Sequence, residues 1–358
     1  MRTDGRLVTL PVTRRTVLGG IAATTATLAA PAIARAQERE LVMVGYGNQS
    51  DAPLIAAGEE LGRRHPGVTL RVIGGLSSEA LAQIKAARGN SPYDLAVMGS
   101  PAIVNALAED VIVPLDASKI PNAANIDPLF VPYGYDTGVP VLFEGIGIAY
   151  DQSKVETPPT TWAELWDERF KGRVGMCRPQ SNLGLGVLAA TCEAFGQPQS
   201  NLTFALEKWM ELDPLVGRSP NLLQQMIERG EVDLAPLWHV NTALAAASGL
   251  PIGYVKIAGP GPLMLPTSIV QFVNTADGVS ELVHEFADIM LTPEIQMIAG
   301  SEPIYFGTVV EGIETPEEAT PYVPATDEEM ATTTSLDWQT IAPMRGETVE
   351  AFDRMFAG

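Results

Sequence analysis

The carboxylate of Glu144 is the side chain whose sequence surroundings most clearly point to chemistry. It lies in the segment Val-Leu-Phe-Glu-Gly-Ile at residues 141–146, where all its neighbours are apolar or glycine. Burying a carboxylate is costly unless a positive group pairs with it. We therefore expect Glu144 to meet a cation, which is either a bound solute or an arginine of the protein itself.

Aromatic residues could complete an amine site around this carboxylate. Such a site needs a carboxylate for the ammonium head and aromatic faces for the cation and its methylene chain. Phe143, Tyr46 and Trp238 fit that pattern, and the polar residues that follow Trp238 favour a cleft over core packing. Arg178 could instead grip a carboxylate or phosphonate, which would favour a zwitterionic amine over a polyamine.

Motifs for catalysis and for metal binding are sparse in this sequence. The two cysteines do not form a CxxC pair, the three histidines lie far apart, and no HExxH or GxSxG motif is present. An enzyme would have His239 and Glu144 as its acid–base pair. We expect no catalytic residue, no resident cofactor and no metal ligand.

The first third of the chain predicts the framework that would position these residues. Apolar runs at 41–44, 68–73 and 94–98 read as strands, and helical spacing covers 53–64 and 78–88. This alternation predicts a parallel sheet with right-handed crossovers. Ligands bind outside the carboxyl ends of the strands in such sheets.

Small polar residues follow the first and third of these strands. The first is followed by Gly-Tyr-Gly-Asn-Gln-Ser at 45–50, and the third by Gly-Ser-Pro at 99–101. We expect Ser100 to be the N-cap of a helix and Pro101 its first residue. Both loops should then direct helix N-terminal amides into one crevice.

A second α/β unit is predicted after residue 160. Residues 137–150 are extended without helical periodicity, and Thr161 to Glu164 form a capping box that opens a short helix. A polar loop at 178–182 follows the next expected strand. Further strands are expected at 173–177, 234–237, 252–256 and 268–273, and helices at 183–195, 202–212, 221–229, 279–291, 294–299 and 347–356.

The N-terminus predicts export. Residues 13–18 form a twin-arginine pattern, an apolar run spans 17–30, and Ala-Arg-Ala at 34–36 is a small-x-small cleavage site. Removing residues 1–36, with five arginines and one aspartate, changes the net charge from −20 to −24. A surface this acidic repels nucleic acid and anionic lipid. We expect a periplasmic protein without a retained membrane anchor.

Cys177 and Cys192 are expected to be free, buried thiols. An even cysteine count in an oxidising compartment favours a disulfide. However, Cys177 ends a strand, and Cys192 lies about nine residues into the following helix, which has by then run back about 13 Å. A disulfide requires Cα atoms within about 7 Å of each other.

Taken in order, several segments resemble the periplasmic solute-binding proteins of ABC importers, in the branch that binds spermidine, putrescine or ferric iron. The likeness covers roughly residues 41–300. It rests on Tyr-Asp-Leu-Ala-Val at 93–97, Gly-Ile-Gly-Ile-Ala-Tyr-Asp at 145–151, Pro-Thr-Thr-Trp-Ala-Glu-Leu-Trp at 159–166, Phe-Lys-Gly-Arg-Val at 170–174 and Gly-Glu-Val-Asp-Leu-Ala at 230–235.

This resemblance implies an α/β fold with two Rossmann-like lobes, joined by crossing hinge strands around a ligand cleft. Residues 137–150 would hold the first crossing and residues 260–268 the return. The expected division is a signal peptide at 1–36, a first lobe at 37–140 plus 264–325, a second lobe at 141–263, and a C-terminal helical segment at 326–358 that packs on the lobes.

By position, the resemblance also implies a site between the lobes. It would use Tyr46, Asn48, Gln49, Ser100, Phe143, Glu144, Gln180, Ser181, Asn182, Trp238, His239 and Tyr305. The expected ligand is a small polar solute with an amine, delivered by a monomer to membrane permease subunits. A ferric-iron or anion binder remains an alternative, although Phe306 replaces the second of the adjacent tyrosines of ferric binders. A sensor protein as an additional partner leaves no mark in the sequence.

Overall fold

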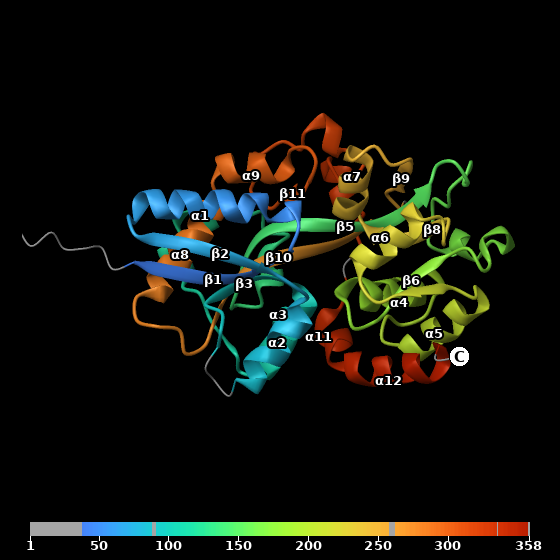
Figure 1. The fold of residues 1–358 in the computed structure, drawn as a ribbon, viewed down its shortest axis with the longest axis horizontal. Helices are drawn as coiled ribbons and strands as arrows, with labels where there is room; N and C mark the ends of the chain where they lie inside the picture. The colour runs from blue at the N-terminus through green and yellow to red at the C-terminus, as the bar shows by residue number, and fades with distance from the viewer. Residues whose placement is uncertain (1–37, 88–90, 258–261, 335, 357–358) are drawn as a thin grey trace, which may run out of the picture. The chain divides into compact units, whose positions relative to one another are not determined.

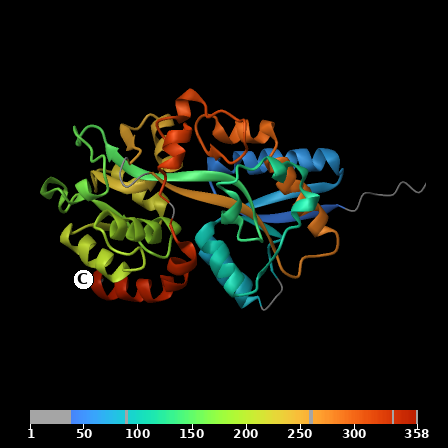
Figure 2. The same cartoon turned by 180° about the vertical axis from the view of Figure 1, so that it is seen from behind.

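The computed structural model describes residues 38–87, 91–257, 262–334 and 336–356. The expected export signal at 1–36 lies outside the described residues. In the described part of the chain, no helix is both long enough and apolar enough to cross a bilayer. Figures 1 and 2 show an α/β protein in which helices cover both faces of a central sheet.

The first lobe is built on a parallel sheet, as the strand and helix alternation predicts. Strand β1 (Arg39–Gly45) lies between β2 (Val68–Gly74) and β3 (Leu95–Gly99) and pairs in parallel with both. Its helices are α1 (Ala52–Arg64), α2 (Ser77–Ala86), α3 (Ser100–Ala108), α8 (Val279–Met290) and α9 (Pro293–Gly300). The short strands β4 (Ile112–Val113) and β11 (Gly307–Thr308) pair with β10 and β5 respectively.

Two long antiparallel strands join the lobes. They are β5 (Val139–Asp151) and β10 (Leu263–Phe272), and Figure 1 shows both crossing from one lobe to the other. In the first lobe β10 pairs with β3, and in the second lobe β5 pairs with β8 (Leu234–Trp238) and β9 (Ile252–Val255). The predicted first crossing at 137–150 is therefore confirmed, and β10 is the return crossing.

The second lobe consists mainly of residues between β5 and β10. The short strands β6 (Gly175–Cys177) and β7 (Leu215–Gly217) pair in parallel. Its α-helices among the described residues are α4 (Asn182–Ala194), α5 (Leu202–Glu211), α6 (Pro220–Glu228) and α7 (His239–Ala247). The lobe encloses its own apolar core, which holds Trp162 and Trp209, whereas Phe130, Phe143 and Phe286 lie in a core of the first lobe.

The C-terminal segment contacts both lobes. It contains α10 (Asp327–Ala331), α11 (Trp338–Ile341) and α12 (Arg345–Phe356). Helix α11 packs against α3 of the first lobe, while α12 packs against α5 of the second. The Trp338 side chain is fully buried within the core of the second lobe.

Most expected elements are present, but two helix starts differ, and the sequence does not predict β7 or α7. Gly99 is the N-cap of α3, so Ser100 and Pro101 both lie in its first turn. The segment after Thr161 is a 3₁₀ helix (Ala163–Trp166), although Glu164 accepts the backbone N–H of Thr160 at 2.7 Å. Helix α7 was not expected, because strand β8 passes directly into it without a turn residue.

The prediction of free thiols is confirmed. Cys177 and Cys192 are both free and buried. The Cys177 sulfur lies 3.1 Å from the Ser181 hydroxyl, and the Cys192 sulfur lies 3.1 Å from the carbonyl oxygen of Asn201. Burial raises the pKa of Cys177 to about 12 and that of Cys192 to about 11. Both groups are therefore protonated at neutral pH.

Candidate functional site

A cavity of about 150 Å³ lies at the point where the strands of both lobes end. A cavity of this size accommodates a molecule about as large as benzene. Its walls come from the loops after β1, β2 and β3, from the crossing strands, and from the starts of α4, α6 and α7. The described lining residues are Gly45, Tyr46, Asn48, Ser50, Gly75, Leu76, Ser77, Ser78, Val97, Gly99, Glu144, Gln180, Ser181, Asn182, Leu183, Pro220, Asn221, Trp238, Val240, Asn241, Leu265 and Thr267.

Seven of the twelve sequence-predicted residues line this cavity. They are Tyr46, Asn48, Glu144, Gln180, Ser181, Asn182 and Trp238. They come from four separate segments of the chain, at residues 46–48, 144, 180–182 and 238. The double α/β pattern predicts that the loops at 46–50, 99–101, 143–144, 180–182 and 238–239 converge, and each of these five loops contributes at least one lining residue.

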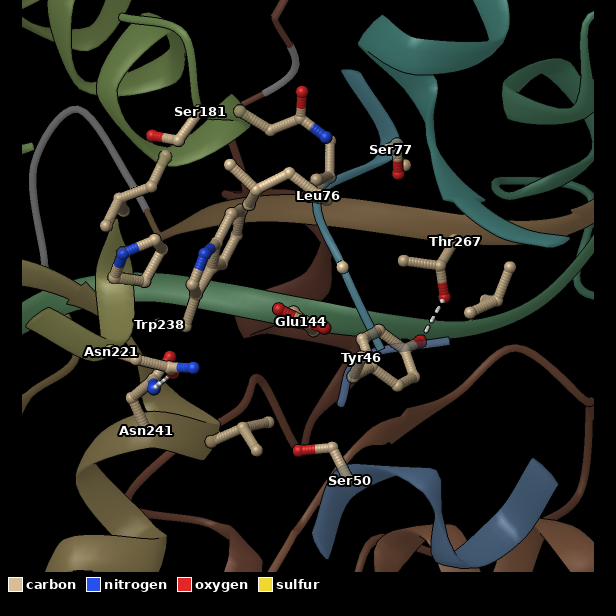
Figure 3. A pocket seen from close by; sticks show the side chains of 18 of the residues that line it. Tyr46, Ser50, Leu76, Ser77, Glu144, Ser181, Asn221, Trp238, Asn241 and Thr267 are labelled. Carbon is tan, nitrogen blue, oxygen red and sulfur yellow. Dashed lines mark hydrogen bonds between the residues drawn. The ribbon is translucent and has the colours of Figure 1, made fainter. Parts of the chain in front are cut away.

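Glu144 occupies the centre of the cavity wall (Figure 3). It is 8% exposed, and no hydrogen bond or ion pair links its carboxylate to another described residue. In this view it lies between the rings of Trp238 and Tyr46. Burial raises the pKa of Glu144 to about 8. A positive group bound beside it would supply the pairing that the protein does not.

Tyr46 is held in place by contacts of its hydroxyl, its ring and its backbone N–H. Its hydroxyl lies 3.1 Å from the Thr267 hydroxyl, and its ring packs against Phe306 with centroids 5.2 Å apart. Its backbone N–H and that of Gly47 donate to the Asp51 carboxylate at 2.7 and 2.9 Å. The pKa of Tyr46 is raised well above its ordinary value, chiefly by burial and further by the nearby Glu144.

The loop that carries Tyr46 requires glycine at its closest approach to β2. Gly47 has φ +84°, and a Cβ built on it would lie 2.8 Å from the Cα of Gly74. Gly74 in turn has no room for a Cβ against Gly47. The two backbones therefore meet directly, which brings the loop after β1 beside the loop after β2.

Helix N-termini surround the cavity. Lining residues lie at the first turn or N-cap of α2 (Ser77, Ser78), α3 (Gly99), α4 (Ser181, Asn182), α6 (Pro220, Asn221) and α7 (Trp238). The first N–H groups of a helix have no intrahelical acceptor and carry partial positive charge. Among the described lining residues there is one carboxylate, Glu144, and no lysine, arginine or histidine.

An amide pair shapes the wall formed by α6 and α7. The Asn241 side chain donates to Asn221 Oδ1 at 2.8 Å and to Gln224 Oε1 at 3.1 Å (Figure 3). The Oδ1 atom of Asn241 and the Nδ2 atom of Asn221 have no hydrogen-bond partner among the described residues, so both remain for a ligand.

Four predicted residues do not line the cavity because they are fixed elsewhere in the structure. Phe143 points to the opposite face of β5 from Glu144, as successive strand residues must, and stacks on Phe130. Ser100 is fully buried in the first turn of α3. Tyr305 stacks on Tyr322 with ring centroids 5.2 Å apart. Gln49 faces a different groove, between α1 and α9.

His239, the fifth predicted residue outside the cavity, is a buried structural side chain. Its Nδ1 accepts the backbone N–H of Gly145 at 2.8 Å, and its Nε2 donates to the Tyr305 carbonyl at 2.9 Å. Burial lowers its pKa to about 4, so the ring is neutral. Both nitrogens are engaged, which leaves neither for acid–base chemistry with Glu144.

The residues that sequence reasoning missed carry recognisable signals. Ser77 and Ser78 start the helix after the second strand, and the Ser-Pro-Asn sequence at 219–221 is an N-cap followed by a first-turn proline. Thr267 lies on the return crossing and faces the cavity through the strand alternation. Extending the strand-end argument to the second strand would have identified Ser77 and Ser78, whereas residues 219–221 follow β7, a strand that the sequence does not predict.

No metal centre is apparent among the described residues. No group of three or more His, Cys, Asp or Glu side chains gathers in the part of the chain that the structure describes. Arg178, considered as an anion ligand from the sequence, pairs with Asp353 and lies over the Phe352 ring. Its Nε also donates to Gln180 Oε1 at 3.2 Å, so Arg178 contacts the cavity wall only through that side chain.

Comparison with known proteins places these observations in context. Residues 56–332 match the family described as bacterial extracellular solute-binding protein. The gamma-aminobutyric acid-binding protein of Pseudomonas aeruginosa is 24% identical over 318 residues, which are 83% of this chain and 86% of the relative. The spermidine/putrescine-binding periplasmic protein 1 of Haemophilus influenzae is 24% identical over 57% of this chain and 59% of its own length.

Solved structures share the fold. The periplasmic binding protein MotA from Agrobacterium tumefaciens, in complex with glucopine, superposes with a TM-score of 0.72 at 20% identity over 88% of this chain and 99% of that one. Iron-bound HitA from P. aeruginosa superposes with a TM-score of 0.68 at 17% identity over 88% and 99%. The two-lobed fold thus accommodates an organic solute in one neighbour and iron in the other.

Proposed function

Because the chain belongs to the family of bacterial extracellular solute-binding proteins, we propose that it captures a small amine-containing solute and delivers it to an ABC importer. The observation that carries this proposal is Glu144, a carboxylate 8% exposed and unpaired among the described residues at the centre of the cavity. An ammonium group would pair with it. The adjacent rings of Trp238 and Tyr46 would cover the cation and its methylene groups.

The relatives support the same chemical class. One is named for gamma-aminobutyric acid and the other for spermidine and putrescine, and each of these solutes carries an amine. The lining of the cavity favours an organic amine over ferric iron, because one carboxylate and several amides and hydroxyls would leave most of the ion's charge uncompensated. The role is binding rather than catalysis, since His239 is fully engaged by backbone groups.

The surrounding biology follows from the family and from the N-terminal sequence. We propose that residues 1–36 direct export by the twin-arginine route and that the mature chain acts in the periplasm as a monomer. Its partners would be the solute and the permease subunits of the importer. We also retain the division into a first lobe at 37–140 plus 264–325, a second lobe at 141–263 and a C-terminal segment at 326–358.

Thermal unfolding against a solute library tests the proposal. The protein is first denatured, washed and refolded so that any solute carried through purification is removed. A ligand that binds the native state raises its stability in proportion to the logarithm of its concentration over Kd. We expect amines to raise Tm without being consumed, and a Glu144→Gln variant to lose that response. Stabilisation by anions or ferric complexes alone, or turnover of a stabilising solute, would contradict the proposal.

A further inference from the structure

Arg345 is a partly buried cation beside the cavity without a carboxylate partner. It lies at the start of α12, and its guanidinium donates to the carbonyl oxygens of Pro179 and Gln180 at 3.3 and 2.6 Å. It also donates to Asn182 Oδ1 at 2.8 Å. Its Nε is shielded from solvent and has no partner among the described residues, and the described carboxylates form no ion pair with it, since its hydrogen bonds are all to carbonyl oxygens. Burial lowers its pKa to about 10, which still leaves it charged at neutral pH.

Arg345 acts on the cavity through the loop that it holds. Gln180 and Asn182 line the cavity, and Ser181 caps α4 by accepting the Gly184 N–H at 2.9 Å. Arg345 donates a hydrogen bond to the side-chain Oδ1 of Asn182, so the Nδ2 of that side chain points away from Arg345. This nitrogen lies 3.2 Å from the position that a Cβ would take on Gly99, another lining residue.

This wall therefore presents hydrogen-bond donors and positive potential. The Asn182 amide nitrogen and the N-terminus of α4 face the cavity, and the guanidinium lies behind them. An anionic oxygen is the group that such a wall stabilises. The nearby Arg178 differs because Asp353 neutralises its charge.

Glu144 and Arg345 are thus an acidic and a basic group beside one cavity, and neither has an ion-pair partner among the described residues. Glu144 comes from the crossing strand β5, and Arg345 supports the loop that starts α4. A polyamine would need a second carboxylate for its second ammonium group, and the described lining residues provide one carboxylate in total. A solute with one ammonium group and one anionic group would match both charges.

We propose that Arg345 is a specificity-determining positioning residue, which makes the wall at residues 180–182 a subsite for a carboxylate or phosphonate. The solute is then a zwitterion whose ammonium group lies against Glu144, so this inference rests on the proposed function. Arg345 lies outside residues 56–332, the part of the chain that matches the family.

Calorimetry with matched probes tests this assignment on the full mature chain. The probes are ω-amino acids of three to six carbons and 2-aminoethylphosphonate, together with n-alkylamines and α,ω-diamines of equal length. We expect the best amino acid or aminophosphonate to bind about 100-fold more tightly than its alkylamine counterpart, with the diamine weaker still. A diamine that binds more tightly than the matched amino acid would overturn the assignment.

Variants separate an electrostatic role from a structural one. Arg345→Gln should reduce the preference for the amino acid over the alkylamine by about tenfold while alkylamine affinity holds. Arg345→Lys, which keeps the charge, should restore most of the preference even if Arg345→Gln folds poorly. Arg229→Gln is the control, and it should leave the preference unchanged because Arg229 pairs with Glu231 and does not line the cavity.

The same titrations distinguish failure of this inference from failure of the proposed function. If Glu144→Gln weakens the alkylamine but Arg345→Gln leaves the preference unchanged, the anionic subsite is wrong and the amine site stands. If Glu144→Gln has no effect on alkylamine binding, or no probe binds the wild-type protein, both are wrong.

Discussion

Two carboxylates, Glu144 within β5 and Asp233 beside the end of β5, are similarly buried, but only Asp233 has partners within the described protein. Asp233 is 6% exposed and pairs with Arg173 and with Lys154, whose ammonium lies 3.2 Å away. Glu144 is 8% exposed and has no such partner among the described residues. A buried charge is stable only when it is paired. The fold supplies cationic partners for Asp233, whereas Glu144 has none among the described residues.

This difference separates a structural carboxylate from a binding one. The cations of Asp233 come from the polypeptide, and they join the start of β8 to the turns after β5 and before β6. The cation of Glu144 has to come from outside. The exposed fractions of the two side chains are nearly equal, so only their ion-pair partners distinguish them.

Glu144→Gln should have the largest effect on binding. We expect the affinity for a cationic ligand to fall by about 2–5 kcal/mol, because the amide cannot neutralise a buried ammonium. The stability of the empty protein should not fall, since no internal pair is broken. Isothermal titration and thermal unfolding of the two proteins measure these quantities. Unchanged affinity, or a large loss of stability without ligand, would assign Glu144 a structural role.

Lowering the pH should weaken binding through the same carboxyl group. With its pKa raised to about 8 by burial, Glu144 is protonated in the empty protein below that pH, so an ammonium must displace a proton to bind. We expect affinity to fall by about tenfold per pH unit below 8 and to level off above it. Titrations at pH 6 to 9 in buffers of different ionisation enthalpy would detect the released proton.

The stability of the empty protein should change with pH in the opposite sense. The folded pKa of Glu144 lies above its unfolded value, so the folded state binds the proton more tightly and loses stability as pH rises towards 8. Glu144→Gln should remove this part of the pH dependence. Identical stability–pH curves for the two proteins would contradict the raised pKa.

Asp233→Asn should show the reverse pattern at a smaller magnitude. The Arg173 and Lys154 side chains are 49% and 35% exposed, so solvent screens both pairs. We expect a loss of about 1–3 kcal/mol of unfolding free energy, below the cost of breaking a fully buried pair. Ligand affinity should be unchanged, as measured by denaturant unfolding and calorimetry. A loss of ligand affinity as large as that caused by Glu144→Gln would show that Asp233 also takes part in binding.

The thiols should show the smallest response. Both are buried and neutral, so a thiol reagent should react slowly with the native protein. After denaturation without reductant, two thiols should titrate per chain. Finding none would demonstrate a disulfide and overturn the structural assignment.

The alternation of strands and helices could be predicted because each signal is local. Apolar runs such as 41–44 and helical spacing such as 53–64 require no knowledge of the fold. Glu144 was identified for the same reason, as a carboxylate inside an apolar extended segment. Including Phe143 beside it was inconsistent with that segment being a strand, whose adjacent side chains face opposite ways.

Other parts of the site depend on contacts that sequence does not reveal. Whether Ser100 or Gly99 faces the cavity is decided by the start of α3, which shifts by a single residue. Ring packing against Tyr322 decides the position of Tyr305. The contact between Arg345 and Asn182 joins residues 163 positions apart, and no local pattern near either predicts it.

The burial of Trp338 also has a consequence for how the chain is made. Residues 141–263 form most of the second lobe. Its core nevertheless includes Trp338, which is synthesised some 75 residues later. Domains generally form as units during synthesis, N-terminal first. The apolar core of the second lobe can therefore be completed only after α11, which carries Trp338, has been synthesised. A chain that lacks Trp338 would therefore have a second lobe whose apolar core is incomplete.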